Sequence, residues 1–327
     1  MPQNKITNPP PASGIRQQWE DMPQKIRTLI EDHLGSKVVK AETQSGGFSP
    51  GVAARISTAD DRTFFLKAIG TNLNPTSVVF HRREIQINAQ LPQNAFAPRL
   101  LWSTDDADDT EWAALLFDNV DGYNPPTPWQ HADLQRVIQA LNTLSETLTP
   151  SPLAAGTVPG ADDYFATRIH GWQRIKEDEI KRNNLDDWSQ RYLDALCDME
   201  KQAPAAVKGQ TLVHFDIRAD NMVISEDAVW IVDWPHACIG AAWLDVVAFA
   251  PSVAMQGGLQ PEDLLQQHPP CQHADPDAIT AAVASIAGML THSALLPPPP
   301  GLPTLREFQN GLAIVTRQWL AQRTGLG

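Results

Sequence analysis

His214 to Asn221 read HFDIRADN, and Asp233 follows twelve positions later within 231–237, IVDWPHA. The apolar runs 222–224 and 229–232, with a turn at 225–228, predict a β-hairpin. The entry and exit of an antiparallel hairpin lie side by side, so Asn221 and Asp233 are expected to meet. An amide oxygen and a carboxylate suit Mg²⁺, which completes its shell with water and phosphate. Asp216, just upstream, could take a proton from an attacking hydroxyl. The alternative is a polar surface hairpin.

The bulk composition indicates a globular chain of two lobes or domains. It has 327 residues, of which 42% are hydrophobic, and a net charge of −13. The sequence has no basic cluster of the kind that a nucleic-acid-binding protein shows, so a nucleic-acid partner is not expected. The acidity fits ordinary solubility or a cationic ligand. The three cysteines form no CxxC pair, no signal peptide or 18-residue apolar run is present, and a cytoplasmic location is expected.

Two halves differ in their predicted elements. The first half has a helix near 21–34, a helix near 77–91, and strands at 38–44, 52–58, 63–69, 98–105 and 111–120, with an acidic turn, DDADD, before the last strand. The second half has helices at 130–148, 161–178, 186–202, 241–254, 275–296 and 305–324, with short strands at 211–217, 221–225 and 229–234. PPPPG at 297–301 predicts a stiff connector. We expect a disordered tail at 1–14, a nucleotide-binding lobe at 15–121 and a catalytic, acceptor-binding lobe at 122–327.

Several segments resemble a known family. The pattern H-x-D-x-x-x-x-N followed by two apolar residues and Asp resembles the catalytic and metal loops of the protein-kinase-like fold. It is most similar to the aminoglycoside phosphotransferases and choline-kinase-like small-molecule kinases. Four further segments fit in order: GFSPG at 47–51, FFLK at 64–67, LLFDNVDG at 115–122 and GAAWLDVVAFA at 240–250. The resemblance therefore covers most of 40–250.

On the nucleotide side, the resemblance implies a phosphate loop, an ion pair and a hinge. The loop comprises Gly47, Phe48 and Ser49, whose backbone N–H groups can face phosphate oxygens. Lys67 is expected to contact the α- and β-phosphates with Glu84 as its partner, although Arg82 and Arg83 leave open which cation Glu84 holds. Phe117 would border the adenine pocket, and the Asp118 carbonyl and the Val120 amide would bond to the adenine edge.

On the chemical side, the resemblance implies that Asp216 is the catalytic base and that Asn221 and Asp233 bind Mg²⁺. Arg218 would steady the γ-phosphate. His214 is expected to orient the loop rather than to act as a base, and Asp245 to anchor it. Trp234-Pro235 stands where protein kinases have Phe-Gly, and the A-P-E element is missing, which argues against a protein-kinase activation loop.

The sequence thus predicts an α+β, bilobal protein-kinase-like fold, with an N-terminal antiparallel β-sheet lobe and a larger, mostly helical C-terminal lobe. The expected reaction is Mg²⁺-dependent phosphorylation of a small-molecule hydroxyl by ATP or GTP, with no nucleic-acid or membrane partner. The acceptor stays open between an aminoglycoside or other antibiotic and a metabolic sugar or amino alcohol, and a non-catalytic pseudokinase is the other alternative. Oligomeric state is not readable. Candidate acceptor-binding residues are Asp162, Asp163, Tyr164, Trp172, Asp186 and Asp187.

Overall fold

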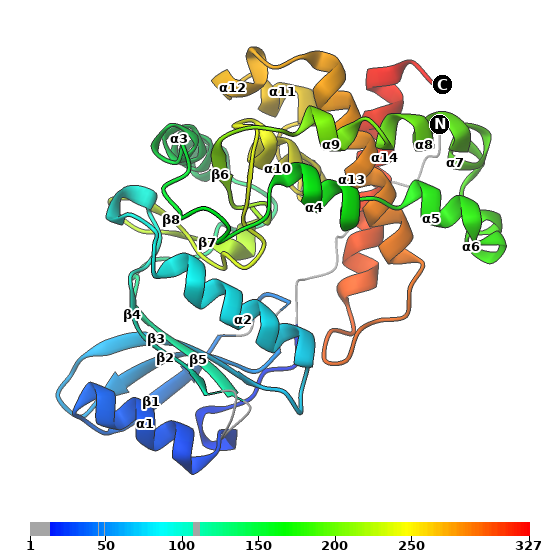
Figure 1. Cartoon of the computed structure of the whole chain (residues 1–327). Coiled ribbons are helices and arrows are strands. Elements are labelled where there is room, and N and C mark those ends of the chain that lie inside the picture. Colours follow the sequence, from blue (N-terminus) through cyan, green and yellow to red (C-terminus); the bar gives the residue numbers. More distant parts are fainter. Residues whose placement is uncertain (1–13, 45, 49, 107–111) are drawn as a thin grey trace.

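A five-stranded antiparallel sheet forms the N-terminal part of the described chain (Figure 1). The computed structural model describes residues 14–44, 46–48, 50–106 and 112–327. The tail predicted at 1–14, except for Gly14, the Ser49 assignment and most of the acidic turn therefore lie outside the described residues. The strand order is β1-β2-β3-β5-β4. The strands are β1 (Val38–Thr43), β2 (Val52–Thr58), β3 (Thr63–Gly70), β4 (Leu100–Asp106) and β5 (Trp112–Asp118).

One helix covers each face of this sheet. Alternate residues of a strand point to opposite faces, and the even positions of β3 and β5, such as Leu66 and Leu116, pack with α1 (Gln24–Leu34). The odd positions include Ile69, which packs against Val78 of α2 (Pro75–Asn88). Lys67 also occupies an odd position, so this alternation directs it away from α1.

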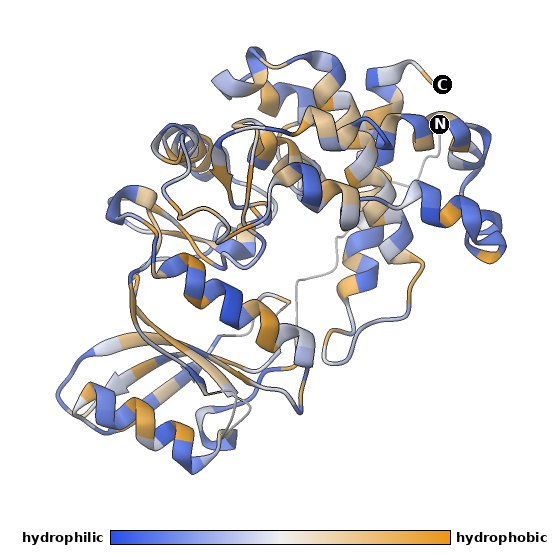
Figure 2. Ribbon diagram, viewed as in Figure 1, coloured by the Kyte–Doolittle hydropathy of each residue, from blue (hydrophilic) through white to orange (hydrophobic). Residues whose placement is uncertain are grey.

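The C-terminal part is mostly helical and contains two small two-stranded sheets. Strand β6 (Thr211–Val213) pairs with β9 (Cys238–Gly240), and β7 (Met222–Ile224) pairs with β8 (Val229–Ile231). The helices are α3 (His131–Thr147), α4 (Ala161–Thr167), α5 (Trp172–Glu177), α6 (Glu179–Asn183), α7 (Asp187–Arg191), α8 (Leu193–Glu200), α9 (Ala203–Ala206), α10 (Leu244–Met255), α11 (Pro261–Leu265), α12 (Pro269–Gln272), α13 (Pro276–Ala294) and α14 (Leu305–Thr324). Figure 2 shows the contrast between the largely hydrophobic α13 and the mostly hydrophilic α5 and α6.

Two predicted helices are interrupted. The helix expected at 161–178 is α4 and α5, and a Cβ built on Gly171 between them would lie 1.9 Å from the Gly288 carbonyl oxygen. The backbone at Gly171 lies so close to α13 that only glycine fits, and a helical residue with a side chain cannot occupy this position. The helix expected at 186–202 is likewise divided into α7 and α8. The predicted strand at 211–217 ends at Val213.

A loop joins the two parts a second time, far from the sheet-to-helix connection at 118–122 (Figure 1). We call residues 295–304, between α13 and α14, the proline-rich loop. Its Gly301 carbonyl accepts from the Ile15 amide at 2.9 Å, and its Pro300 carbonyl accepts from Asn74 Nδ2 at 3.3 Å. No helix in the described part of the chain is both long and apolar enough to span a bilayer.

Candidate active site

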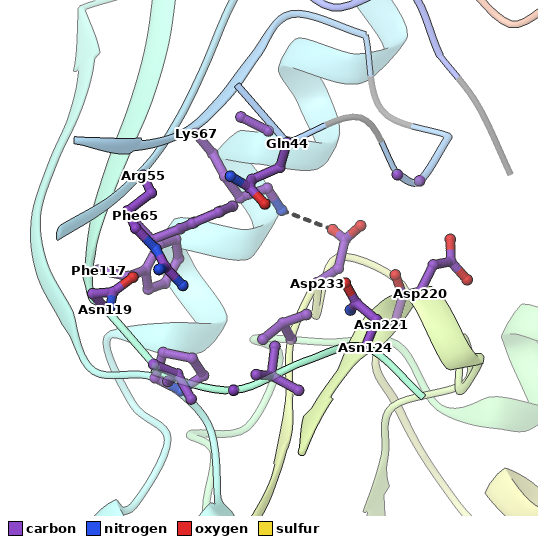
Figure 3. Close-up of a pocket in the computed structure, with 18 of the residues that line it drawn as sticks. Gln44, Arg55, Phe65, Lys67, Phe117, Asn119, Asn124, Asp220, Asn221 and Asp233 are labelled. Carbon is purple, nitrogen blue, oxygen red and sulfur yellow. Dashed lines mark hydrogen bonds and ion pairs between the residues drawn. The ribbon is translucent and has the colours of Figure 1, made fainter. Parts of the chain in front are cut away.

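A pocket of about 270 Å³ lies between the sheet and the β7–β8 hairpin. Figure 3 shows Phe65, Phe117 and Asn119 at one end and Lys67 and Asp233 at the other. Asp118 and Val120 also line it, so the predicted hinge borders the pocket. The chain after the hinge pairs with β7, because the Tyr123 amide donates to the Ile224 carbonyl and the Ile224 amide donates back. These bonds fix the hinge against the hairpin that carries the predicted metal ligands.

Lys67 lies between two carboxylates from different parts of the chain. Its Nζ is 2.5 Å from Glu84 Oε2 on α2 and 2.8 Å from Asp233 Oδ1 after β8. The sequence left open which cation Glu84 holds, and the structure assigns Lys67. Arg82 instead pairs with Asp105, and Arg83 donates to the Ala237 carbonyl.

The electrostatics of this triad favour a charged lysine. Burial opposes the charge, but Asp233 and Glu84 outweigh it, and the pKa of Lys67 lies above its ordinary value. Burial also opposes ionisation of Asp233, yet the Lys67 ammonium lowers the Asp233 pKa overall. Burial raises the pKa of Glu84 despite the same ammonium. Asp233 is therefore the carboxylate of the triad that holds its negative charge most firmly.

Buried groups hold the catalytic loop in place. The Asp245 carboxylate accepts from the backbone amides of His214, at 3.0 Å, and Phe215, at 2.7 Å. His214 Nδ1 accepts from the Asp216 amide at 3.2 Å, which leaves Nε2–H to donate to the Val232 carbonyl at 3.0 Å. Burial lowers the pKa of His214 to about 4, so the ring is neutral near pH 7. These contacts are those of loop-orienting residues.

Asp216 is surrounded by donors on one side. Its Oδ1 accepts from Arg218 Nη1 at 2.7 Å, and its Oδ2 accepts from Asn221 Nδ2 at 2.9 Å. Burial raises the pKa of Asp216, and Arg218 partly offsets this. Arg218 also bonds to both carboxylate oxygens of Asp220. Asp220 is thus an ion-pair partner rather than a solvated neighbour.

Asn221 and Asp233 fit a magnesium ion. Both Nδ2 bonds of Asn221 go to Asp216, to its carbonyl and its carboxylate, so the amide oxygen faces another way. Asp233 uses Oδ1 for Lys67, which leaves Oδ2 outside that ion pair. Within the described residues no group of three or more His, Cys, Asp or Glu forms a metal site. One carboxylate and one amide suit Mg²⁺, which takes few protein ligands beside phosphate and water.

The glycine loop and Arg16, which the sequence analysis did not single out, line the same pocket. Gly51 has φ +100°, and a Cβ there would lie 2.6 Å from the Ala68 carbonyl oxygen, so the loop needs glycine. Gly47 lines the pocket. Arg16 also lines it, and its guanidinium donates to the Gly46 carbonyl. No motif surrounds Arg16, so sequence patterns do not point to it.

Phe48 points to a different place from its loop neighbours. Its ring packs edge-on against Phe308, with centroids 5.1 Å apart, and lines a second cavity of about 660 Å³. Asp216 and Arg218 lie in the wall of this cavity, and Glu84 and Asp233 line both cavities. The two spaces therefore meet at the Lys67 triad.

Only one of the predicted acceptor-binding residues lines the larger cavity. That residue is Tyr164, whose hydroxyl lies 3.0 Å from His236 Nδ1. Trp172 is fully buried and donates to the Ala284 carbonyl. The four predicted carboxylates lie elsewhere: Asp162, Asp163, Asp186 and Asp187. His81 and His236 do line this cavity, and neither was singled out from the sequence.

The sheet with its lysine–glutamate pair, set against a helical lobe that carries the catalytic loop, is the arrangement of protein-kinase-like phosphotransferases. A family model described as the phosphotransferase enzyme family, APH, matches residues 43–308. The chain belongs to this family and is a small-molecule phosphotransferase. No curated protein sequence is significantly similar to it.

Solved structures share the fold at low sequence identity. A thermostable mutant of aminoglycoside phosphotransferase APH(4)-Ia, in complex with AMP-PNP and hygromycin B, has a TM-score of 0.59 at 11% identity, over 93% of this chain and 99% of that one. The gentamicin–APH(2")-IIa complex has 0.59 at 12% identity, over 92% and 97%. Choline kinase LicA from Streptococcus pneumoniae has 0.57 at 10% identity, over 90% and 100%. The fold prediction is thereby confirmed.

Proposed function

We propose that this protein transfers the γ-phosphoryl group of ATP, or of GTP, to a hydroxyl of a small molecule, with Mg²⁺. The observation that carries the proposal is the meeting of the two cavities at one charged cluster. Glu84 and Asp233 line both spaces, and Asp216 lies in the wall of the larger one. A nucleotide in the smaller cavity and an acceptor in the larger one would present phosphate and hydroxyl to the same residues.

Each residue of the cluster has a role in this proposal. Phe117, Asp118 and Val120 border the space for the base, and Gly47 and Lys67 hold the phosphates. Asn221 and Asp233 bind Mg²⁺, which supplies charge neutralisation for the phosphates. Asp216 orients the acceptor hydroxyl and takes its proton, and Arg218 stands beside the transferring group. In the expected division, 15–121 supplies the glycine loop, Lys67 and most of the hinge, and 122–327 supplies Asp216 and the Mg²⁺ ligands, while residues from both ranges line each cavity.

The protein kinase relatives of this fold act on polypeptides, but no feature here favours that acceptor. Trp234 fills the position after Asp233 and is 1% exposed, and its indole packs on His214 with ring centroids 4.7 Å apart. The residue thus stabilises the catalytic loop from within, and the following chain passes directly to β9. The short connection supports a small-molecule acceptor.

Two measurements test the proposal. A thermal-shift titration with ATP and Mg²⁺ should raise Tm, because a ligand that binds only the folded state stabilises it. The same titration with ATP and EDTA is the control and should give a smaller shift. ADP formation is then followed with a panel of hydroxyl compounds. A lack of any shift at millimolar nucleotide would favour the pseudokinase alternative.

A further inference from the structure

The larger cavity is apolar away from its catalytic end. Its wall is formed by side chains of α10, α13, α14 and the proline-rich loop, including Pro251, Ile286, Met289, Leu302, Leu305 and Leu312. Its volume of about 660 Å³ is within the range of drug-sized ligand pockets. An acceptor that fills this space is held mainly by removal of hydrocarbon from water.

The carboxylates that line the cavity already have cationic partners from the chain. Glu84 and Asp233 pair with Lys67, and Asp216 pairs with Arg218 at 2.7 Å. Among the described lining residues the other ionisable groups are His81, His236 and Tyr164. Burial lowers the pKa of both histidines, to about 3 for His81, and raises the pKa of Tyr164 to about 12. The wall therefore offers little uncompensated negative charge to an acceptor with several ammonium groups.

The four carboxylates expected to hold a polycation lie outside this cavity, and two of them have cationic partners. Asp162 pairs with Lys208 at 3.4 Å, and Asp186 caps α7 and pairs with Arg317 at 3.0 Å. Asp163 lines a separate pocket together with Arg83, Arg168 and Arg174. Asp187 is exposed on α7. Since the separate pocket is rich in guanidinium groups, it also does not suit a cationic acceptor.

The aromatic rings of the cavity do not form a free cage for a quaternary ammonium ion. Such cages need open ring faces. The Arg218 guanidinium lies 5.4 Å from the Phe48 ring centroid and 5.9 Å from that of Phe308. The Arg83 guanidinium lies 5.9 Å from the Tyr164 centroid. Guanidinium groups of the chain itself thus lie over three of these rings, where a ligand cation would have to bind.

We infer that the acceptor is an uncharged alcohol with a mostly hydrocarbon body, an inference that rests on the function proposed above. The acceptor oxygen forms a bond to the γ-phosphorus while the bond from that phosphorus to the β–γ bridging oxygen breaks. ADP leaves with the bridging oxygen, and the hydroxyl proton passes to the Asp216 carboxylate. The products are ADP and the phosphate monoester of the alcohol.

The test is a homologous series of primary alkanols, from 1-butanol to 1-decanol, with the full chain and MgATP. Phosphate monoester is measured by ³¹P NMR or mass spectrometry, which separates transfer from hydrolysis of ATP by water. We expect kcat/KM to rise by up to about fourfold for each added methylene until the cavity is filled, because each buried CH₂ contributes a similar increment. Kanamycin and choline are the charged comparison acceptors and should be poorer than the longest alkanols.

A pair of variants on α14 tests whether this wall provides the selectivity. Leu312 is partly exposed and lines the cavity, so Leu312→Glu should lower kcat/KM for 1-decanol at least tenfold, through KM, and flatten the chain-length dependence. Ile314 is partly exposed on the same helix but is not among the lining residues, so Ile314→Glu is the matched control and should keep the wild-type dependence. MgATP stabilisation should persist in both variants.

The outcomes separate the inference from the proposed function. A flat chain-length series, or a higher kcat/KM with kanamycin or choline than with 1-decanol, overturns the inference while phosphotransfer stands. A protein that shows no stabilisation by MgATP and forms no phosphate ester with any acceptor overturns both. The wild-type series is decisive by itself if Leu312→Glu does not fold.

Discussion

The two cavities that meet at Lys67 are built in different ways. The smaller one has apolar walls that include Phe65 and Phe117, and its charged and amide groups come from short segments with recognisable spacing, such as Lys67, Asn221 and Asp233. The larger one is lined mainly by apolar residues that lie far apart in the chain, from Phe48 to Leu312. The difference teaches that local motifs supply the groups proposed for the reaction, whereas the wall of the proposed acceptor cavity depends on how distant helices pack.

The largest expected effect comes from the residue proposed as the base. Asp216→Asn should lower kcat by roughly 10²–10⁴-fold, because general-base catalysis contributes about that much, while MgATP binding by calorimetry stays nearly unchanged. Asp227→Asn, at an exposed turn of the hairpin, is the control. Full turnover in Asp216→Asn would mean that another residue is the base. Weakened nucleotide binding would mean that Asp216 also contributes to the nucleotide cavity.

The next effect concerns the charged triad. Lys67→Met should lower the free energy of unfolding by about 3–5 kcal/mol, because it leaves the carboxylates of Glu84 and Asp233 buried without their cation. Nucleotide affinity should fall as well. Urea unfolding and an ATP titration measure the two effects.

Lys40→Met provides the comparison for this change, since Lys40 is an exposed residue of the same sheet. It should alter stability by less than about 1 kcal/mol. If Lys67→Met and Lys40→Met lowered the free energy of unfolding equally, the buried Lys67 ion pairs would contribute no more to stability than an exposed lysine of the same sheet.

The pH dependence of stability tests the neutral state of His214. Its folded-state pKa of about 4 lies below the ordinary value of 6.5, so the unfolded chain binds a proton in this interval before the folded one does. The contribution is therefore fully present above pH 6.5 and is lost as pH falls towards 4. The difference in unfolding free energy between wild type and His214→Gln should shrink by up to about 3 kcal/mol over that window.

Urea unfolding at several pH values measures this difference. His131→Gln, at the exposed start of α3, should leave the wild-type profile unchanged. A His214 contribution that grows as pH falls would show a charged ring in the folded state and would reopen its role as a catalyst.

The smallest effect concerns the border between the acceptor cavity and the N-terminal sheet. Asn74 accepts from the Ser77 amide at 3.1 Å as the cap of α2 and donates to the Pro300 carbonyl. Asn74→Ala should cost about 1 kcal/mol in unfolding free energy. Asn74→Asp keeps the cap and removes only the donor to Pro300, so it should retain most of that stability. The difference in unfolding free energy between Asn74→Ala and Asn74→Asp separates the contribution of the α2 cap from that of the hydrogen bond to Pro300.

Much of the fold was predictable because its strands alternate. The strand expected at 52–58 is β2, and the one expected at 63–69 is β3 with one added residue. β9 was missed because Cys238-Ile239-Gly240 has one β-branched residue and ends in glycine, whereas the equally short β7 and β8 lie in runs rich in valine and isoleucine. The interruption at Gly171 depends on contact with Gly288, more than a hundred residues away, which no local pattern reveals.

The parts of the site that lie in short sequence motifs were predictable, and the parts that depend on distant contacts were not. The Lys67–Glu84 pair and the contacts of His214 and Asp245 agree with the expected geometry, but the functional roles of these residues stay predictions. The domain boundary at 121/122 and the cytoplasmic location also stay predictions. Phe48 was expected to serve the nucleotide through its backbone amide, which stays a prediction, while its ring lies against Phe308 at the other cavity. The four acidic acceptor candidates, which were chosen for their charge, do not line the larger cavity.

The proline-rich loop makes the molecule a closed ring around its reacting groups. One junction is covalent, at 118–122, and the other consists of the hydrogen bonds from Ile15 to Gly301 and from Asn74 to Pro300. The Lys67–Asp233 ion pair and the Phe48–Phe308 ring contact also join the sheet to the helical part of the chain. Opening the molecule at the loop would therefore break an ion pair and a ring contact together with the two hydrogen bonds, so the loop alone does not set how far the two parts separate.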